Sequence, residues 1–444
     1  MNVRNTRAIA LASIGLAVMA GPVHAFDVAA VKGDIVREVD ADYPRMDALY
    51  KDIHAHPELS FQEIQTAAKL AQIMRGLGFT VTEGVGGTGV VALYKNGPGP
   101  LVLVRTELDA LPMRERTGLP YSSEAKAQWK GGETYVAHSC GHDSHMAIWT
   151  GAAKALLALK SRWHGTLMFI GQPAEEAGGG ASAMLADGLY TRFGGKPDYA
   201  LALHVGPGPA GEVTYRAGPI TSNVDPMEIV FNGRGAHGSM PNMSIDPVMM
   251  AARFVVDVQS VVSREKDPMA FGVVTVGAIQ AGSAGNIIPD SALLRGTVRS
   301  YDDDVRRRLL DGIRRTANGV AAMAGAPAPA ITVERGGHSV INDAVLEART
   351  AVVLKAAFGD RAHEEPRPWT ASEDFSAFVD AGVPGMFLSL GALDPAKIAA
   401  AKGVGEPVPS NHSPLFAPLP EPTIKAGVLA MTLMVLNVMS ATSS

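Results

Sequence analysis

The first half of the chain alternates between short apolar runs and segments with helical periodicity. Runs of about four to eight apolar residues predict buried strands, and apolar residues at every third or fourth position predict helices. Helical segments lie at residues 40–54, 60–78 and 146–159, and strand-like runs at 80–83, 89–94, 101–105, 166–170 and 199–203. Strands that alternate with helices form largely parallel sheets with helices on both faces. The pattern therefore predicts an α/β domain with three layers.

The pattern changes near Gly218. Residues 226–335 follow the order strand, helix, strand, strand, helix, strand, which is typical of the ferredoxin-like α+β fold. The strand-like runs lie at 227–232, 271–280, 292–300 and 330–334, and the helical segments at 247–263 and 302–323. We therefore expect residues 26–217 and 336–444 to form one domain and residues 218–335 to form a second domain inserted into it.

The two ends of the chain are both apolar. At the start, Arg4 and Arg7 precede an apolar run at residues 8–20, and Val23-His24-Ala25 offers a small-residue cleavage site. This is the three-part pattern of a secretory signal. We expect residues 1–25 to be removed and the mature chain to be exported to the periplasm, with an uncleaved membrane anchor as the alternative. The run at 423–439 is short for a spanning helix, so we expect core packing and no stable membrane insertion.

Composition narrows the choice of partners. The 444 residues are 47% hydrophobic and carry a net charge of −5, and no basic stripe indicates a nucleic-acid partner. The chain has a single cysteine, Cys140. A lone cysteine cannot form an internal disulfide, so in an oxidising compartment it must be buried or bound to a metal.

The segment Ala137–His145 contains this cysteine and three histidines. Cys140 and His142 make a compact pair of metal ligands, suited to zinc, cobalt, nickel or manganese. Both precede a helical segment, and a helix N-terminus favours a thiolate over a thiol. A buried structural cysteine beside surface histidines is the alternative, so the segment needs partners elsewhere in the chain.

Acidic residues and a further histidine follow three of the predicted strands. Asp109, Glu175, Glu176 and His204 each come at or just after the carboxyl end of an apolar run. Those ends meet at one edge of a parallel sheet, where active sites assemble. A helix cap or a solvated loop is the alternative for any one of them. Together with the cysteine pair, they predict a metal site.

Three other polar motifs have simpler explanations. Residues 60–63, Ser-Phe-Gln-Glu, have the form of a helix capping box. No nearby acid is placed to complete a metal site with His54 and His56, so we do not assign them as ligands. His237 and Asn286 stand in glycine-flanked turns of the inserted segment, and turn residues and functional residues are equally compatible with that setting.

Taken together, the motifs resemble the co-catalytic metal aminoacylase/carboxypeptidase family, in its branch of hippurate hydrolases and auxin–amino acid conjugate hydrolases. The resemblance extends over nearly all of the predicted mature chain. It rests on segments 52–59, 108–112, 138–143, 172–176, 203–205, 296–299, 372–375 and 412–414, and on the Gly-x-His and Asn-x-Ile-Pro elements of the inserted segment.

This resemblance implies two divalent metal ions per subunit, of zinc, manganese, nickel or cobalt. It assigns as ligands Cys140, His142, Glu176, His204 and His412. The resemblance also implies roles for five further residues. Glu175 would be the general base, Asp109 would orient a ligand, and His237 would stabilise the oxyanion, often from the partner subunit. Asn286 and Arg299 would lie near the substrate.

The function that follows is hydrolysis of N-acyl amino acids, which are small molecules, to a carboxylic acid and a free amino acid. The inserted domain would form a lid and the interface of a homodimer or higher oligomer. A dipeptidase or carboxypeptidase is the nearest alternative, and a non-catalytic exported metal- or solute-binding protein is another. Where the family has Arg-Ala-Asp-Met-Asp, this chain has residues 105–109 as Arg-Thr-Glu-Leu-Asp, so Glu107 has no assigned role.

Overall fold

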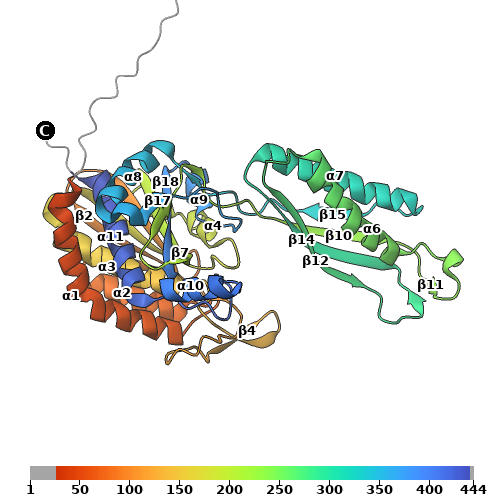
Figure 1. Cartoon of the computed structure of the whole chain (residues 1–444), viewed down its shortest axis with the longest axis horizontal. Helices are drawn as coiled ribbons and strands as arrows, with labels where there is room; N and C mark the ends of the chain where they lie inside the picture. The colour runs from red at the N-terminus through yellow and green to blue at the C-terminus, as the bar shows by residue number, and fades with distance from the viewer. Residues whose placement is uncertain (1–26, 441–444) are drawn as a thin grey trace, which may run out of the picture.

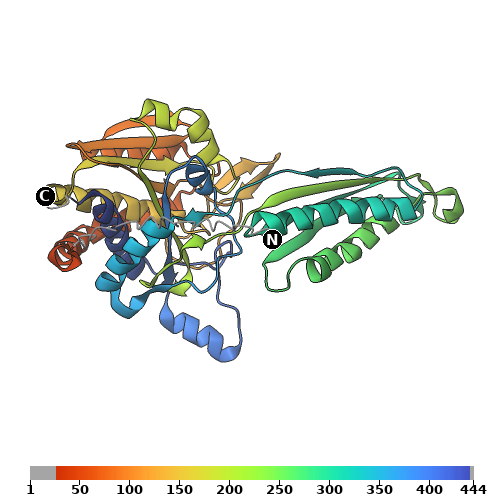
Figure 2. The same cartoon turned by 90° about the horizontal axis from the view of Figure 1, so that it is seen from above.

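Two main sheets organise residues 27–440, the part of the chain that the computed structural model describes. Figure 1 shows the larger sheet within a helix-covered lobe and the smaller one in an elongated lobe beside it. Figure 2 shows that extended segments connect the two lobes. The predicted signal sequence, residues 1–25, lies outside the described residues.

The larger sheet has eight strands in the order β1-β2-β6-β3-β7-β18-β8-β17. Its strands are β1 (Thr80–Val85), β2 (Gly89–Asn96), β3 (Leu101–Glu107), β6 (Gly165–Gln172), β7 (Tyr199–Pro209), β8 (Val213–Tyr215), β17 (Ala362–Glu364) and β18 (Gly385–Leu393). The four central strands, β6, β3, β7 and β18, are parallel to one another. Strand β2 pairs antiparallel with β6, β1 with β2, and β8 with β18, whereas the edge strand β17 pairs parallel with β8. The sheet is therefore parallel at its centre and mixed overall.

Helices cover both faces of this sheet, which confirms the predicted three layers. On β3 the side chains of Val102 and Val104 enter the core under one set of helices, and Leu103 enters the core on the opposite face. The first set comprises α1 (Val28–Ala55), α2 (Ile64–Gly76), α3 (His142–Ala158), α8 (Ala344–Phe358) and α11 (Pro420–Met439). The second comprises α4 (Gly180–Ala186), α5 (Leu189–Arg192) and α9 (Ser376–Asp380).

Helix α11 is the one helix of residues 27–440 that is long and apolar enough to cross a membrane. Its apolar stretch is 83% buried inside the protein, against α1, α3 and α8. A core position therefore accounts for its composition, as expected from the sequence.

The smaller sheet is antiparallel, with the order β12-β14-β10-β15. Its strands are β10 (Asp225–Asn232), β12 (Gly272–Ala281), β14 (Ser291–Ser300) and β15 (Ala330–Val333), and its helices are α6 (Pro247–Ser260) and α7 (Asp303–Met323). The two helices share one apolar core with the sheet, and Asp246 and Asp302 cap their N-termini. The chain order and the strand order are those of the ferredoxin-like fold.

Short elements complete the chain. They are the hairpin β4 (Lys126–Trp129) and β5 (Gly132–Tyr135), the pair β9 (Gly218–Pro219) and β16 (Ile341–Asn342), the ribbon β11 (Ala236–His237) and β13 (Ile287–Ile288), and helix α10 (Pro395–Val404). The pair β9 and β16 brings together the two segments that lead into and out of the inserted lobe.

The predicted capping box before α2 does not form. The helix begins at Ile64, and the Glu63 carboxylate instead accepts hydrogen bonds from the Ala174 N–H at 2.8 Å and from the Thr88 hydroxyl. The Ser60 hydroxyl donates to Asp109 at 2.7 Å. Partners distant in sequence thus replace the local capping bonds and tie this segment to the edge of the sheet that carries the candidate site.

Candidate active site

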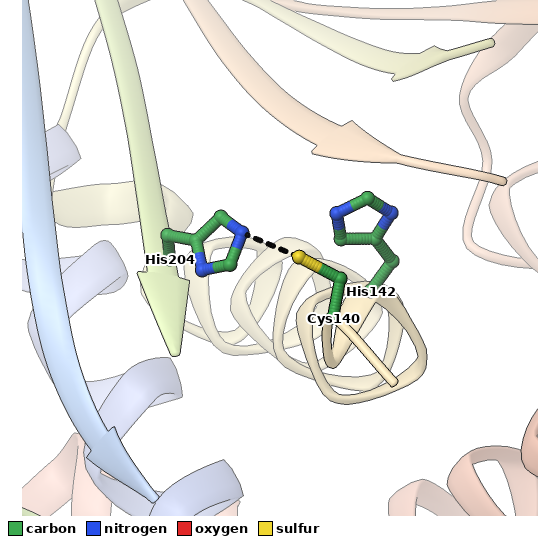
Figure 3. A group of neighbouring side chains, drawn as sticks. All are labelled: Cys140, His142 and His204. Atoms are coloured by element: carbon green, nitrogen blue, oxygen red, sulfur yellow. Dashed lines mark hydrogen bonds between the residues drawn. The ribbon is translucent and has the colours of Figure 1, made fainter. Parts of the chain in front are cut away.

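Three of the predicted ligands meet beside the start of α3. Cys140 and His142 flank the helix N-cap, Gly141, and His204 faces them from β7 (Figure 3). Cys140 Sγ lies 3.3 Å from His204 Nε2, and one potential ligand atom from each of the three residues lies within 4.8 Å of the others. His204 was predicted to follow its strand. It lies within it, because β18 continues to pair alongside β7 at Ser389.

Backbone carbonyls orient both imidazole rings toward this group. His142 Nδ1 lies 2.8 Å from the backbone oxygen of Asp109, and His204 Nδ1 lies 2.7 Å from that of Val205. A carbonyl can only accept a hydrogen bond, so each Nδ1 must carry the proton. Each Nε2 then keeps its lone pair and is the atom that can ligate a metal.

The tandem acids complete the group of ligands. Glu176 lies 3.3 Å from His412 Nε2, and Cys140, Glu176 and His412 offer ligand atoms within 4.8 Å of one another. His142, Glu175 and Glu176 form a further such set. His412 adopts a φ of 65°, and its backbone N–H donates to the Ser139 carbonyl at 2.8 Å. All five predicted ligands therefore meet in one place.

Asp109 holds the turn that carries the two glutamates. Its carboxylate accepts backbone N–H groups from Glu175 at 3.1 Å and Glu176 at 3.0 Å, as well as the Ser60 hydroxyl. The preceding residue, Ala174, has a φ of 49°, in the left-handed region that non-glycine residues rarely adopt. Asp109 is fully buried, and its two backbone hydrogen bonds hold a strained turn. Its carboxylate also lies 3.6 Å from Nδ1 of the ligand His142, beside which it was predicted to act.

The donor set fits divalent metal ions. His142 Nε2 and Glu176 Oε1 are buried and have no hydrogen-bond partner among the residues that the structure describes, although buried polar atoms are normally paired. Sulfur, imidazole nitrogen and carboxylate oxygen together suit zinc and neighbouring transition metals. Burial lowers the pKa of His142, but Asp109 and the surrounding glutamates outweigh it and raise the pKa to about 10. The carboxylates around His142 thus stabilise a positive charge beside its ring, which is what a bound metal cation would supply.

The expected effect of the helix N-terminus on Cys140 is wrong for the protein alone. Burial, with the charges of Glu176 and Glu175, raises the pKa of the thiol well above its ordinary value. Burial and the nearby carboxylates outweigh the helix dipole, so a bound cation is what would stabilise a thiolate here.

A buried arginine lies behind the glutamates. The Arg105 guanidinium contacts Glu107, donates to Glu373 at 2.6 Å, to Asp374 at 3.1 Å and to Gln172 at 2.9 Å. These residues were not assigned from the sequence. The Ser-Glu-Asp-Phe motif at 372–375 was the available signal, but no local pattern links it to Arg105, which is 268 residues away.

The centre opens into a cavity of about 810 Å³ between the two lobes. Cys140, Glu175, Glu176, His204 and His412 line its floor. Its walls are partly apolar, and residues of both lobes contribute: Val224, Phe271, Val273, Arg299, Trp369 and Phe387. This volume is that of a site for a small molecule.

Arg299 is in this cavity, as predicted for a residue near the substrate. Its Nη1 donates to the Thr370 carbonyl at 3.1 Å, and no carboxylate within residues 27–440 pairs with its guanidinium. His237 and Asn286 are not in the cavity. They are exposed on the ribbon β11–β13, which Figure 1 shows at the end of the inserted lobe far from the larger sheet.

Fold and site together define a metal-binding α/β protein whose centre faces an inserted domain. The model of peptidase family M20/M25/M40 matches residues 103–404. Thermostable carboxypeptidase 2 of Saccharolobus solfataricus is 33% identical over 413 residues, 91% of this chain and 99% of that protein. Hippurate hydrolase of Campylobacter jejuni is 37% identical over 336 residues, 74% of this chain and 83% of that protein.

A solved structure agrees. The Bacillus subtilis YXEP protein, a dinuclear metal-binding peptidase of the M20 family, matches with a TM-score of 0.71 and 29% identity, over 90% of this chain and 100% of that chain. The chain therefore belongs to peptidase family M20/M25/M40, which confirms the resemblance seen in the sequence.

Proposed function

We propose that this protein is a metal-dependent amidohydrolase that cleaves N-acyl amino acids into a carboxylic acid and a free amino acid. The observation that carries the proposal is the position of Glu175. It lies beside the ligand Glu176, at the floor of a cavity that also contains the guanidinium of Arg299, which pairs with no carboxylate of residues 27–440. A site that only stored metal would not need a carboxylate kept beside the ligands. The relationship to hippurate hydrolase supports the choice of substrate class.

Cys140, His142, Glu176, His204 and His412 would hold two divalent metal ions, as the relationship to a dinuclear M20 peptidase supports. When bound, such ions polarise the scissile carbonyl and lower the pKa of water. Zinc, manganese, nickel and cobalt all suit this mixed donor set.

Glu175 performs the proton transfers. Burial and the charge of Glu373 raise its pKa well above the ordinary value, which makes its carboxylate a stronger base. It takes a proton from water as the water oxygen adds to the carbonyl carbon, and it returns that proton to the amine nitrogen as the C–N bond breaks. Arg299 binds the free carboxylate of the amino-acid half.

His237 would donate a hydrogen bond to the oxyanion from the partner subunit of a homodimer. The Ser239 N–H donates to His237 Nδ1 at 3.1 Å, so the proton of the neutral ring lies on Nε2. His237 Nε2–H can therefore donate a hydrogen bond, and His237 does not line the cavity of its own subunit. Asn286 lies beside His237, since its backbone carbonyl accepts a hydrogen bond from the Gly238 N–H at 2.8 Å. Asn286 would therefore enter the same active site of the partner subunit.

A test is the release of amino acid from N-acetyl, N-benzoyl and long-chain N-acyl amino acids and from simple dipeptides. Each compound would be incubated with enzyme from which a chelator has removed the metal, and with enzyme reloaded with a single divalent metal. Metal-dependent release from acyl amino acids is expected. Release from dipeptides alone would instead favour a carboxypeptidase or dipeptidase, an alternative that the Saccharolobus relative supports. Metal-loaded enzyme without any hydrolysis would favour a binding protein.

Export is a separate part of the proposal, supported by the signal pattern at residues 1–25. N-terminal sequencing of the protein from the periplasmic fraction of a Gram-negative expression host should begin at Phe26. A cytoplasmic protein that retains Met1 or its neighbours would contradict it.

A further inference from the structure

The parallel strands β3 and β7 separate below the metal site. They pair from Val102 to Val104, opposite Tyr199 to Leu201, and their pairing ends there. Each strand nevertheless continues with its other neighbour: β3 pairs with β6 as far as Glu107, and β7 pairs with β18 beyond His204. The ligand His204 therefore stands on a strand that has lost its neighbour on one side.

The side chain of His145 occupies this opening. The backbone N–H of Val205 donates to His145 Nε2 at 2.8 Å, so the proton of the ring lies on Nδ1. Nδ1 donates in turn to Glu107 Oε2 at 2.8 Å, and Arg105 holds the other oxygen of Glu107. His145, Glu107 and Val205 are all buried. An imidazole and a carboxylate thus bridge the two strands where backbone pairing has ended.

The same residue, Val205, also orients the ligand through its carbonyl group. The carbonyl of Val205 accepts from His204 Nδ1 at 2.7 Å and from Asn411 Nδ2 at 3.0 Å. Any shift of Val205 would therefore move the ring of His204. We propose that Glu107 and His145 are positioning residues, which set the place of His204 and thereby the affinity and geometry of the metal centre.

A direct role as ligands is the competing explanation, because Glu107, His142 and His145 offer atoms within 4.8 Å of one another. The hydrogen bonds argue against it. Both ring nitrogens of His145 are engaged, and Nε2 could bind a metal only by leaving the Val205 N–H unpaired in the core. Both oxygens of Glu107 are likewise engaged by Arg105 and His145.

The test compares Glu107→Gln with a matched control, Glu115→Gln. Both carboxylates are buried and bonded to a histidine, but Glu115 pairs with His54, away from β7. The full-length metal-free proteins would be titrated with Zn²⁺ against a chelator and with Co²⁺, whose visible absorption reports ligand geometry. Glu107→Gln is expected to bind Zn²⁺ about 10–100-fold more weakly and to shift the Co²⁺ bands. Glu115→Gln should match the wild type in both.

Two results would overturn the inference: wild-type zinc affinity and Co²⁺ bands in folded Glu107→Gln, or an equal loss in Glu115→Gln. If Glu107→Gln does not fold, His145→Asn provides the same comparison without removing a charge. The inference rests on the proposed metal centre, and the two can fail separately. A wild-type protein that binds no divalent metal would refute the proposed function, whereas a metal-binding wild type with unaltered variants would refute only the positioning role.

Discussion

The carboxylate of Asp109, which is fully buried, accepts a hydrogen bond from the backbone N–H of Glu176 at 3.0 Å. Its other oxygen accepts the N–H of Glu175 at 3.1 Å. One side chain thus fixes the spacing between a metal ligand and the proposed base. Because the turn is strained at Ala174, it depends on this support more than an ordinary loop would.

Asp109→Asn should therefore reduce kcat by about 10–100-fold with little change in KM. An amide can accept only one of the two N–H groups, and its own NH₂ would face the other. Steady-state kinetics with metal at saturation measure the effect. Ser60→Ala is the control, since it removes one hydrogen bond to Asp109 but neither backbone contact, and should cost less than about tenfold. Equal losses in both variants would contradict a specific role in holding the turn.

Glu175→Gln should bind metal normally and lose turnover. Glutamine has nearly the same shape as glutamate but cannot take a proton from water, and general base catalysis together with proton delivery is worth at least about 10²–10⁴-fold. Metal content per subunit and kcat, measured on the same preparation, separate the two properties. A variant that hydrolyses substrate at the wild-type rate would show that another group is the base.

Subunit mixing tests whether His237 acts in the partner's site. If the proposed homodimer forms, the Glu175→Gln and His237→Ala dimers should each be nearly inactive. A heterodimer should regain one intact site, so equal mixing with free exchange should restore about a quarter of wild-type activity. No recovery, with exchange verified by differently tagged subunits, would place His237 in its own subunit's site or outside catalysis.

His54 should make the stability of the fold decrease at alkaline pH. Its ring lies between Asp143 at 2.6 Å and Glu115 at 3.1 Å, and both contacts are buried. Burial lowers the pKa of His54, but these two carboxylates outweigh it and raise the pKa to about 10, above the ordinary 6.5. The folded state thus holds the proton more tightly than the unfolded state. This stabilisation is complete below pH 6.5 and is lost as the pH rises through 10.

Denaturant unfolding from pH 6.5 to 10 should therefore show a falling free energy of unfolding. His54→Asn should be less stable at pH 6.5, by about 3–5 kcal/mol, because it leaves two buried carboxylates unpaired. In His54→Asn, the free energy of unfolding should also fall much less between pH 6.5 and pH 10 than in the wild type. A decline equally steep in both proteins would assign the pH dependence to other groups.

The sequence by itself determined the class of fold and named the five candidate ligands that the fold brings together. Apolar periodicity located the central strands β3, β6 and β7 to within a few residues of their N-terminal ends, because buried strands and amphipathic helices impose different spacings on the same chain. The order of elements in residues 226–335 likewise indicated the ferredoxin-like arrangement. The five predicted ligands come together because strand ends and a helix start converge at one edge of a parallel sheet.

Tertiary structure decided what those residues touch. Ser60 and Glu63 have the pattern of a helix cap, but their side chains bind Asp109 and Ala174, since buried partners distant in sequence outcompete a local bond. The helix start near Cys140 predicted a thiolate, yet burial of the thiol and the carboxylates that folding brings beside it raise its pKa instead. The bridge from Glu107 through His145 to Val205 exists only because two strands diverge. Periodicity reports which face of an element is buried, whereas hydrogen bonds between distant residues depend on how the elements pack.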